Sequence, residues 1–377
     1  MKKIRVLALG MAALCLLCAC AAWQGDEYLS VSEHNDPFQA QQETESTAEP
    51  QNALPVAENY FGMKAILLSF VTEGVEHGEF LMEHYEGTPG EDLRRAVEYL
   101  TTSDPVGAYA IDYMTFEKEE TDSGWLVSVD AVYRRSASEI EAIESVRGNA
   151  RADELIFAAL QRFDPSVTLR ISGYADEDFE KTIHDYCLAH PEAVIEKPQV
   201  SVSIYPESGN VRVVEFHFGY EHTREELRAR LSEVTGILNS AANYAHYGSD
   251  EASRLSMLYT YLAGRFTYEQ DEQATVYSLL CEGVADSACF SAVFAYLCRT
   301  AGLESHMVEG EKDGAAYDWC QVKVSGVWYH VDIFRCVLAD AHDAELRLDA
   351  DMSGYDWNRE QYPVCDGIPT EEVQNEE

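Results

Sequence analysis

The sequence predicts an α+β protein, in which a duplicated helix-and-strand region precedes a C-terminal domain of helices packed on an antiparallel sheet. Two observations predict this class. Apolar residues recur every three or four positions in some segments, which is typical of helices, and alternate with polar residues in others, which is typical of strands. Between residues 56 and 247 these segments follow one another twice as a helix, a pair of strands and a further helix, and the last 130 residues read as helices followed by strands.

The chain begins with a predicted signal peptide. Basic residues within the first five positions precede an apolar run from Val6 to Leu17. This run is too short to cross a bilayer core of about 30 Å, which needs roughly 20 residues. The sequence Leu17-Cys18-Ala19-Cys20 resembles a bacterial lipobox, whose last cysteine receives the lipid. We therefore expect a signal peptide at residues 1–19, lipidation of Cys20, and a location on the extracytoplasmic face of the bacterial cell membrane.

Residues 20–55 are expected to form a disordered tether behind the lipidated Cys20. From Ala21 to about Pro55 the chain is rich in Gln, Glu, Ser and Thr and contains few apolar residues. Such a composition does not bury enough apolar surface to offset the loss of conformational entropy on folding. The tether would hold the folded part away from the membrane.

The strong negative charge of the chain restricts its partners. The formal net charge is −40 at pH 7, and such a surface repels nucleic acid and anionic lipid headgroups. Nucleic-acid binding is therefore excluded, and contact with the membrane is expected only through the lipid anchor. No stretch after the signal peptide is long and apolar enough to span a bilayer.

The cysteines do not predict a metal site. Three of the ten belong to the signal peptide and anchor, and the rest contain no Cys-x-x-Cys pair and no regular spacing. This pattern argues against a full disulfide framework and against a zinc site, while single disulfides stay open. We expect no metal and no cofactor. The remaining seven are Cys187, Cys281, Cys289, Cys298, Cys320, Cys336 and Cys365.

Residues 56–247 are interpreted as two copies of one α/β unit, with approximate bounds 56–165 and 166–247. In the first copy we predict a helix at 91–100, strands at 108–116 and 125–133, and a helix from about Ala137. In the second copy we predict a helix at 178–187, strands at 199–205 and 211–220, and a helix capped by Thr223. The histidines of this region are scattered, and they are interpreted as packing or surface residues.

Several ordered motifs lie between Glu251 and Cys365. A helix at 254–262 leads to a short helix at 275–280, then to a long helix that begins at Ser287 and ends at Gly302, and strands follow as far as Asp332. This arrangement resembles the transglutaminase-like family, whose papain-type core uses a Cys-His-Asp triad. Residues 248–377 are accordingly expected to form a transglutaminase-like domain.

The resemblance implies a triad at Ser287, Tyr317 and Asp332, and only the aspartate matches the family. A serine hydroxyl needs a general base to become nucleophilic, whereas tyrosine, with an ordinary pKa of about 10, is a poor base near neutrality. We therefore expect a domain that has lost its catalysis. The old cleft, walled by Trp319, Trp328 and Tyr317, would bind a peptide, a protein or a cell-wall component.

Two other side chains leave an enzyme open as the alternative. Cys289 would be the nucleophile if the helix register slipped by two residues, although it then faces about 200° away from Ser287. His330 would be the base, since it lies two residues before Asp332 and so on the same face of a strand. The alternative function is an acyl-transfer enzyme or peptidase that uses Ser287 or Cys289 with these two residues.

Two further readings concern the tail of the chain and the cleft. The segment from Asp349 to Glu360 has the spacing of a calcium-binding loop, but Asp356 stands where such a loop normally places an apolar residue. In a third class of function the domain is a structural spacer, and Tyr317 and its neighbours fill the cleft.

Overall fold

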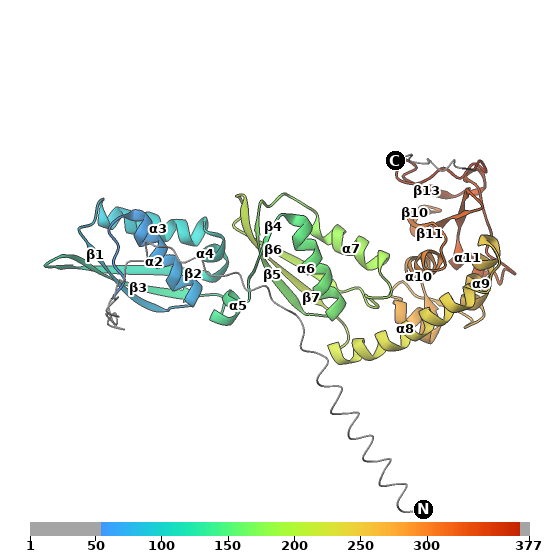
Figure 1. Cartoon of the computed structure of the whole chain (residues 1–377), viewed down its shortest axis with the longest axis horizontal. Helices are drawn as coiled ribbons and strands as arrows, with labels where there is room; N and C mark the ends of the chain where they lie inside the picture. Colours follow the sequence, from blue (N-terminus) through green and yellow to red (C-terminus); the bar gives the residue numbers. More distant parts are fainter. Residues whose placement is uncertain (1–53, 370–377) are drawn as a thin grey trace, which may run out of the picture. The chain divides into compact units, whose positions relative to one another are not determined.

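The computed structural model describes residues 54–369 (Figure 1). The predicted signal peptide, the predicted lipidation residue Cys20 and the predicted tether up to residue 53 lie outside this part of the chain. The first set of elements is α2 (Tyr60–Glu73), β1 (His77–Glu83), α3 (Pro89–Thr102), α4 (Pro105–Ala110), β2 (Ile111–Thr121) and β3 (Gly124–Tyr133). The strands form an antiparallel sheet in the order β1-β3-β2.

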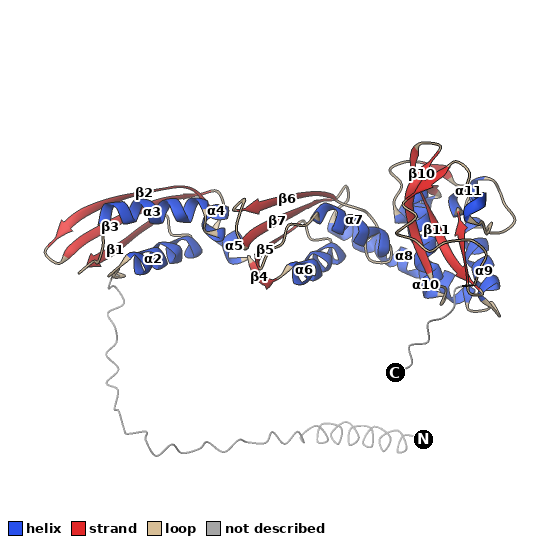
Figure 2. Cartoon of the chain, turned by 90° about the horizontal axis from the view of Figure 1, so that it is seen from above, coloured by secondary structure: helices blue, strands red, loops and turns tan. Residues whose placement is uncertain are grey.

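A second set repeats this order. It contains α6 (Asn149–Arg162), β5 (Ser166–Ser172), α7 (Phe179–Ala189), β6 (Gln199–Tyr205) and β7 (Val211–Gly219). The strand order β5-β7-β6 matches that of the first sheet, and β4 (Glu144–Arg147) is added at the edge, parallel to β5. Figure 2 shows α2 with α3, and α6 with α7, beside their respective sheets.

The repeating unit is larger than the sequence pattern predicted. It runs helix-strand-helix-strand-strand, so each copy has a helix and a strand before the elements that the pattern identified, and the equivalent elements of the second copy begin at Asn149 rather than at residue 166. The predicted strand at 108–116 also begins later, at Ile111. Here Asp104 accepts hydrogen bonds from the Val106 and Gly107 N–H groups, and Pro105 occupies the first turn, so the chain forms the short helix α4 first.

The two helices that were expected to end the copies differ in length and in surroundings. α5 (Ala137–Glu141) is a single short turn, whereas α8 (Arg224–Ala245) is long and begins at the predicted capping box of Thr223 and Glu226. The apolar side chains of α8, including Leu227, Val234 and Leu238, belong to the core of the C-terminal region. α8 is therefore a part of that region rather than an end to the second copy.

The C-terminal region places helices against an antiparallel sheet, as predicted. Helices α9 (Glu251–Ala263) and α10 (Ser287–Thr300) precede a sheet of order β12-β11-β10-β13, and α10 packs on β10 and β11. The strands and the helix between them are β10 (Ser305–Lys312), β11 (Ala315–Val324), β12 (Val327–Val331), α11 (Ile333–Leu338) and β13 (Tyr355–Trp357). Four short elements complete it, namely η1 (Ser278–Glu282), η2 (Asp349–Asp351) and the paired strands β8 (Glu269–Gln270) and β9 (Val284–Ala285).

Burial explains most of the cysteines. All seven that lie between residues 54 and 369 are free thiols, and every one of them except Cys281 is buried. Cysteine in such positions packs as a small apolar residue. Within the same part of the chain no helix has the length and apolarity that a membrane span requires.

Candidate functional site

The start of α10 places Ser287 against the sheet. Asp286 is the N-cap, and its side chain accepts a 2.7 Å hydrogen bond from the Cys289 N–H. Ser287 is the first residue of the helix, and its Oγ accepts a 3.2 Å hydrogen bond from the backbone N–H of Asp318 on β11. The position implied for the nucleophile thus holds a hydroxyl that is bonded to backbone.

Asp332 lies at the centre of a closed hydrogen-bond network. Its side chain is 1% exposed. Oδ1 accepts from the Tyr317 hydroxyl at 2.9 Å and from the Arg335 N–H at 3.0 Å. Oδ2 accepts from the Tyr355 hydroxyl at 2.5 Å and from Lys312 Nζ at 3.2 Å. Four donors, one of them cationic, satisfy the buried carboxylate.

Tyr317 lies where the resemblance places the histidine, next to the aspartate. Burial raises the pKa of its phenol far above the ordinary value, and the adjacent Asp332 carboxylate raises it further. The phenol therefore stays protonated and donates to Asp332. A group in this state does not accept a proton from Ser287, so Tyr317 does not serve as a base.

His330, the alternative base, has neither ring nitrogen bonded to Ser287 or Asp332. The ring is fully buried, its Nδ1 accepts from Trp319 Nε1 at 2.9 Å, and its Nε2 lies 2.8 Å from Asp349 Oδ1. The prediction extended the alternation of a strand as far as Asp332. The two side chains do lie on one side of the sheet, because His330 bonds to Trp319, and Asp332 bonds to Tyr355, whose ring packs on Trp319. Neither ring nitrogen of His330 is bonded to Asp332, however, since both are bonded to Trp319 and Asp349.

The same histidine belongs to a group that resembles a metal site. Atoms of His330, Asp349 and Cys365 lie within 4.8 Å of one another. The indole of Trp319 is only a donor, so Nδ1 of His330 is unprotonated and Nε2 carries the proton that it donates to Asp349. A metal would need a lone pair at that nitrogen. The geometry is therefore that of a hydrogen-bonded core and does not fit a metal centre.

The proposed calcium-loop segment uses its carboxylates in the same way. Asp349 bonds to His330 and lies 3.8 Å from Arg359 Nη1. Asp351 accepts a 3.0 Å hydrogen bond from the Leu348 N–H. The segment then continues as β13, which pairs with β10. These oxygens are turned toward donors of the protein rather than toward a common centre.

Cys289 lacks the features of an activated nucleophile. Its side chain is buried within the capping box of α10, where Sγ lies 3.4 Å from the Asp286 N–H. Burial raises the pKa of the thiol well above its ordinary value, and the Asp286 carboxylate raises it further. The reactive species is the thiolate, which is disfavoured here.

The two tryptophans do not wall a cleft, so that prediction is corrected. Trp319 is fully buried and packs against Tyr355 and Trp357. Trp328 is 6% exposed and stacks on His306 with ring centroids 4.9 Å apart. Large aromatic side chains are mostly buried when their strands lie within a covered sheet.

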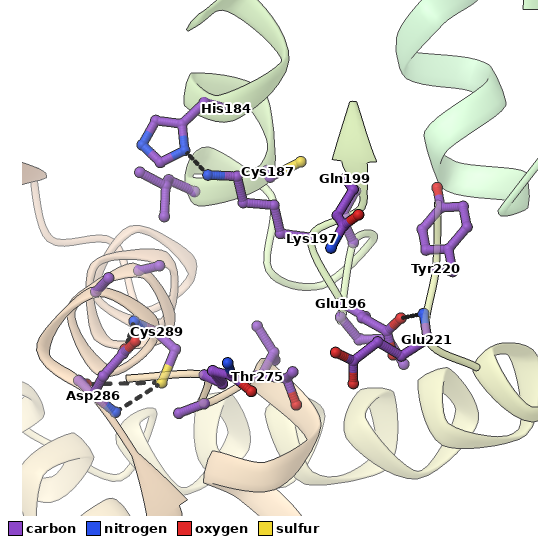
Figure 3. Close-up of a pocket in the computed structure, with 18 of the residues that line it drawn as sticks. His184, Cys187, Glu196, Lys197, Gln199, Tyr220, Glu221, Thr275, Asp286 and Cys289 are labelled. Atoms are coloured by element: carbon purple, nitrogen blue, oxygen red, sulfur yellow. Dashed lines mark hydrogen bonds between the residues drawn. The ribbon is translucent and has the colours of Figure 1, made fainter. Parts of the chain in front are cut away.

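A cavity of about 570 Å³ lies beside the first turns of α10, where Ala288, Cys289 and Ala292 line it. Its lining residues come from α7 and from the segments around β6 and β7, and on the opposite side from α10 and the segment before η1 (Figure 3). The wall is fixed in part by Arg299 of α10, whose Nη2 donates to the Ala189 carbonyl of α7 at 3.0 Å. This volume is within the range of small-ligand sites.

The sequence did not predict the polar residues of this cavity. His184 and Lys197 line it, with Lys197 Nζ 2.5 Å from His184 Nδ1. His184 was interpreted as a packing or surface residue, and Lys197 carried no motif. Neither the spacing nor the residue types link them to Asp286, because only the fold brings α7 next to α10.

Comparison with known proteins identifies the class of the C-terminal region. Residues 240–333, which include α9, α10 and the positions of Ser287, Tyr317 and Asp332, match the family model of the transglutaminase-like superfamily. The chain thus carries a transglutaminase-like domain, in agreement with the resemblance of its motifs. No curated protein matches the chain.

Two solved structures are similar to parts of the chain. A crystal structure of a TGase aligns at 14% identity and a TM-score of 0.25, covering 45% of this chain and 50% of that chain. A candidate protease from Parabacteroides distasonis aligns at 7% identity and a TM-score of 0.20, covering 56% of this chain and 46% of that chain. The chain spans about half the length of each of them.

Proposed function

We propose that this protein is a lipid-anchored, extracytoplasmic binding protein, whose transglutaminase-like domain holds a peptide, a protein or a cell-wall component without catalysing acyl transfer. The single observation that carries the loss of catalysis is the surroundings of Asp332. The donor that meets Oδ1 from the sheet is the phenol of Tyr317 rather than an imidazole. An aspartate in a triad orients the base, and here there is no base to orient.

The rest of the site supports the same proposal. Ser287 Oγ bonds to backbone, and neither alternative residue provides chemistry, because His330 uses both ring nitrogens elsewhere and the thiol of Cys289 is held protonated. The Asp286 carboxylate at the helix start opposes the development of negative charge on Ser287. An inactive domain keeps a fold that is able to bind.

The location rests on the N-terminal sequence. The apolar run from Val6 to Leu17 and the lipobox-like Leu17–Cys20 support export and lipidation of Cys20. If the lipid holds the protein on the outer face of the membrane, the folded part would meet peptides and wall material of the extracytoplasmic space.

Covalent labelling tests the loss of catalysis. The purified full chain is treated with a fluorophosphonate, which labels activated serines, and with iodoacetamide, and the modified residue is located by peptide mass spectrometry. We expect no modification of Ser287 and no modification of Cys289. The Cys289→Ala variant, which lacks this thiol, gives the background labelling of the peptide that contains residue 289. Stoichiometric labelling of either residue in the native chain would establish the alternative, an acyl-transfer enzyme or peptidase.

A further inference from the structure

The cavity beside α10 has an apolar wall and a charged rim. The apolar lining comes from both sides of the cavity and consists of Leu188, Val194, Ile195, Val276, Ala288 and Ala292. Four carboxylates and one ammonium group also line it. Cavities of this kind bind small ligands through apolar contacts, while a few charged groups fix the orientation.

The carboxylates of the rim are unequally engaged. Glu196 is buried, and it accepts from the Glu221 N–H at 2.7 Å and contacts His222 Nδ1 at 2.5 Å. Asp286 caps α10. By contrast, the exposed side chains of Glu221 and Glu272 make no ion pair or hydrogen bond with any residue between 54 and 369. These two carboxylates are available to a cationic group.

The one ammonium group of the rim is also available. Lys197 Nζ donates to the unprotonated Nδ1 of His184, and no carboxylate in the described part of the chain pairs with it. Lysine has three N–H donors, so two are left. Figure 3 shows Lys197 extended toward His184, with Glu221 and Asp286 at other parts of the lining.

From this separation of unpaired charges we infer that the cavity binds a short zwitterionic peptide, whose terminal carboxylate bonds to Lys197 and whose free amino group is met by Glu221 and Glu272. This inference rests on the proposed binding function and names its ligand class. A peptide of two or three residues with small side chains matches both the apolar wall and the volume of about 570 Å³. Charge-assisted hydrogen bonds at each end would fix its direction.

The test uses the full chain in detergent micelles and isothermal titration calorimetry with three probes: trialanine, N-acetyl-trialanine and trialanine amide. We expect trialanine to bind and each capped peptide to bind about tenfold more weakly, since each cap removes one charge pair. Lys197→Met is expected to lower the affinity for trialanine and to make it equal to the affinity for trialanine amide. The double variant Glu221→Gln with Glu272→Gln is expected to make the affinity for trialanine equal to the affinity for N-acetyl-trialanine.

Matched controls separate these effects from changes of the fold or of overall charge. Lys181→Met removes an exposed lysine of α7 that does not line the cavity. Glu282→Gln likewise removes the charge of an exposed glutamate that does not line it. Both are expected to leave all three affinities unchanged. Failure of trialanine to bind, or equal binding of all three probes, overturns the inference. Sensitivity to acetylation alone, with no effect of Lys197→Met, overturns it in favour of a simple amine ligand.

The two proposals fail in different ways. Labelling of Ser287 or Cys289 by an electrophile would contradict the loss of catalysis, whatever the calorimetry shows. Equal binding, or no binding, of the three peptide probes would contradict the zwitterionic ligand. It would not affect the proposed loss of catalysis.

Discussion

The hydroxyl of Tyr317 donates a 2.9 Å hydrogen bond to the buried carboxylate of Asp332, so a phenol takes up the contact that a catalytic imidazole would make in this fold. The two residues come from neighbouring parts of the sheet, since Tyr317 is on β11 and Asp332 follows β12. Lys312 and Tyr355 add two more donors to the same carboxylate. These donors satisfy a buried carboxylate, which gives the contact between Tyr317 and Asp332 a role in the stability of the domain.

This role predicts a loss of stability when the phenol loses its hydroxyl. Tyr317→Phe leaves one lone pair of a buried carboxylate without a donor, and a hydrogen bond to a charged group contributes about 1.5–3 kcal/mol. We expect the free energy of unfolding in urea to fall by about this amount. The control is Tyr329→Phe on β12, a partly buried tyrosine with no hydrogen bond from its hydroxyl to the described residues. Equal losses in both variants would contradict the prediction.

The same geometry predicts that catalytic character is recoverable. Ser287→Cys together with Tyr317→His puts a thiol at the start of α10 and an imidazole beside Asp332, which is the arrangement that lowers the pKa of a thiol. We expect iodoacetamide to alkylate residue 287 at least about tenfold faster at pH 7 in the double variant than in Ser287→Cys alone. Peptide mapping distinguishes this thiol from the native cysteines. Equal rates would show that the surroundings of the triad no longer support the chemistry.

The sequence predicted the C-terminal fold because this fold depends on local order along the chain. The apolar periods and the start of α10 after Asp286 are local, and so is the capping at Thr223. The hydrogen-bond partners of His330 were not predictable, since they depend on how Trp319 and Asp349 pack around the ring. The cavity was missed for the same reason, because Lys197 and Asp286 line one cavity only through the packing of α7 on α10.

The repeat was underestimated for a different physical reason. β5 alternates polar and apolar residues from Ser166 to Ser172 and was missed despite this pattern. By contrast, α2 is apolar along most of its length and shows no clear polar face, and β1 interrupts its alternation with three consecutive apolar residues, Phe80 to Met82. Such segments carry weak periodicity, so a pattern-based prediction passes over them. Their place in each copy is evident only from the shared sheet orders β1-β3-β2 and β5-β7-β6.

A half-buried acid next to Ser287 predicts a pH dependence of stability. Burial, together with the nearby Glu309 and Asp286 carboxylates, raises the pKa of Asp318 to about 6. The folded state therefore binds more protons than the unfolded state between about pH 4 and pH 6, and stability falls as pH rises through this window. Asp318→Asn is expected to increase the free energy of unfolding at pH 7 by about 1–2 kcal/mol, allowing for solvent screening, and to change it little at pH 4.

Urea unfolding at a series of pH values measures this effect. The slope of stability against pH between 4 and 6 is expected to be smaller in Asp318→Asn than in the native chain. Asp112→Asn, at an exposed position of β2, is the control and is expected to keep the native slope. A variant at Asp318 that is less stable at pH 7 than the native chain would show that the carboxylate is favourable in its ionised form.

The final prediction concerns the anchor. If Cys20 carries the lipid, Cys20→Ala expressed in a bacterial host should move the protein from the detergent-rich to the aqueous phase of a Triton X-114 partition, because acyl chains contribute about 0.8 kcal/mol for each buried CH₂. Cys18→Ala is the matched control, since it removes a cysteine two positions earlier and keeps the lipidation residue. Metabolic labelling with palmitate is expected in the native chain and in this control, and not after Cys20→Ala. Equal partition of all three proteins would show that the membrane association, or its absence, does not depend on Cys20, and the extracytoplasmic proposal would then lose its anchor.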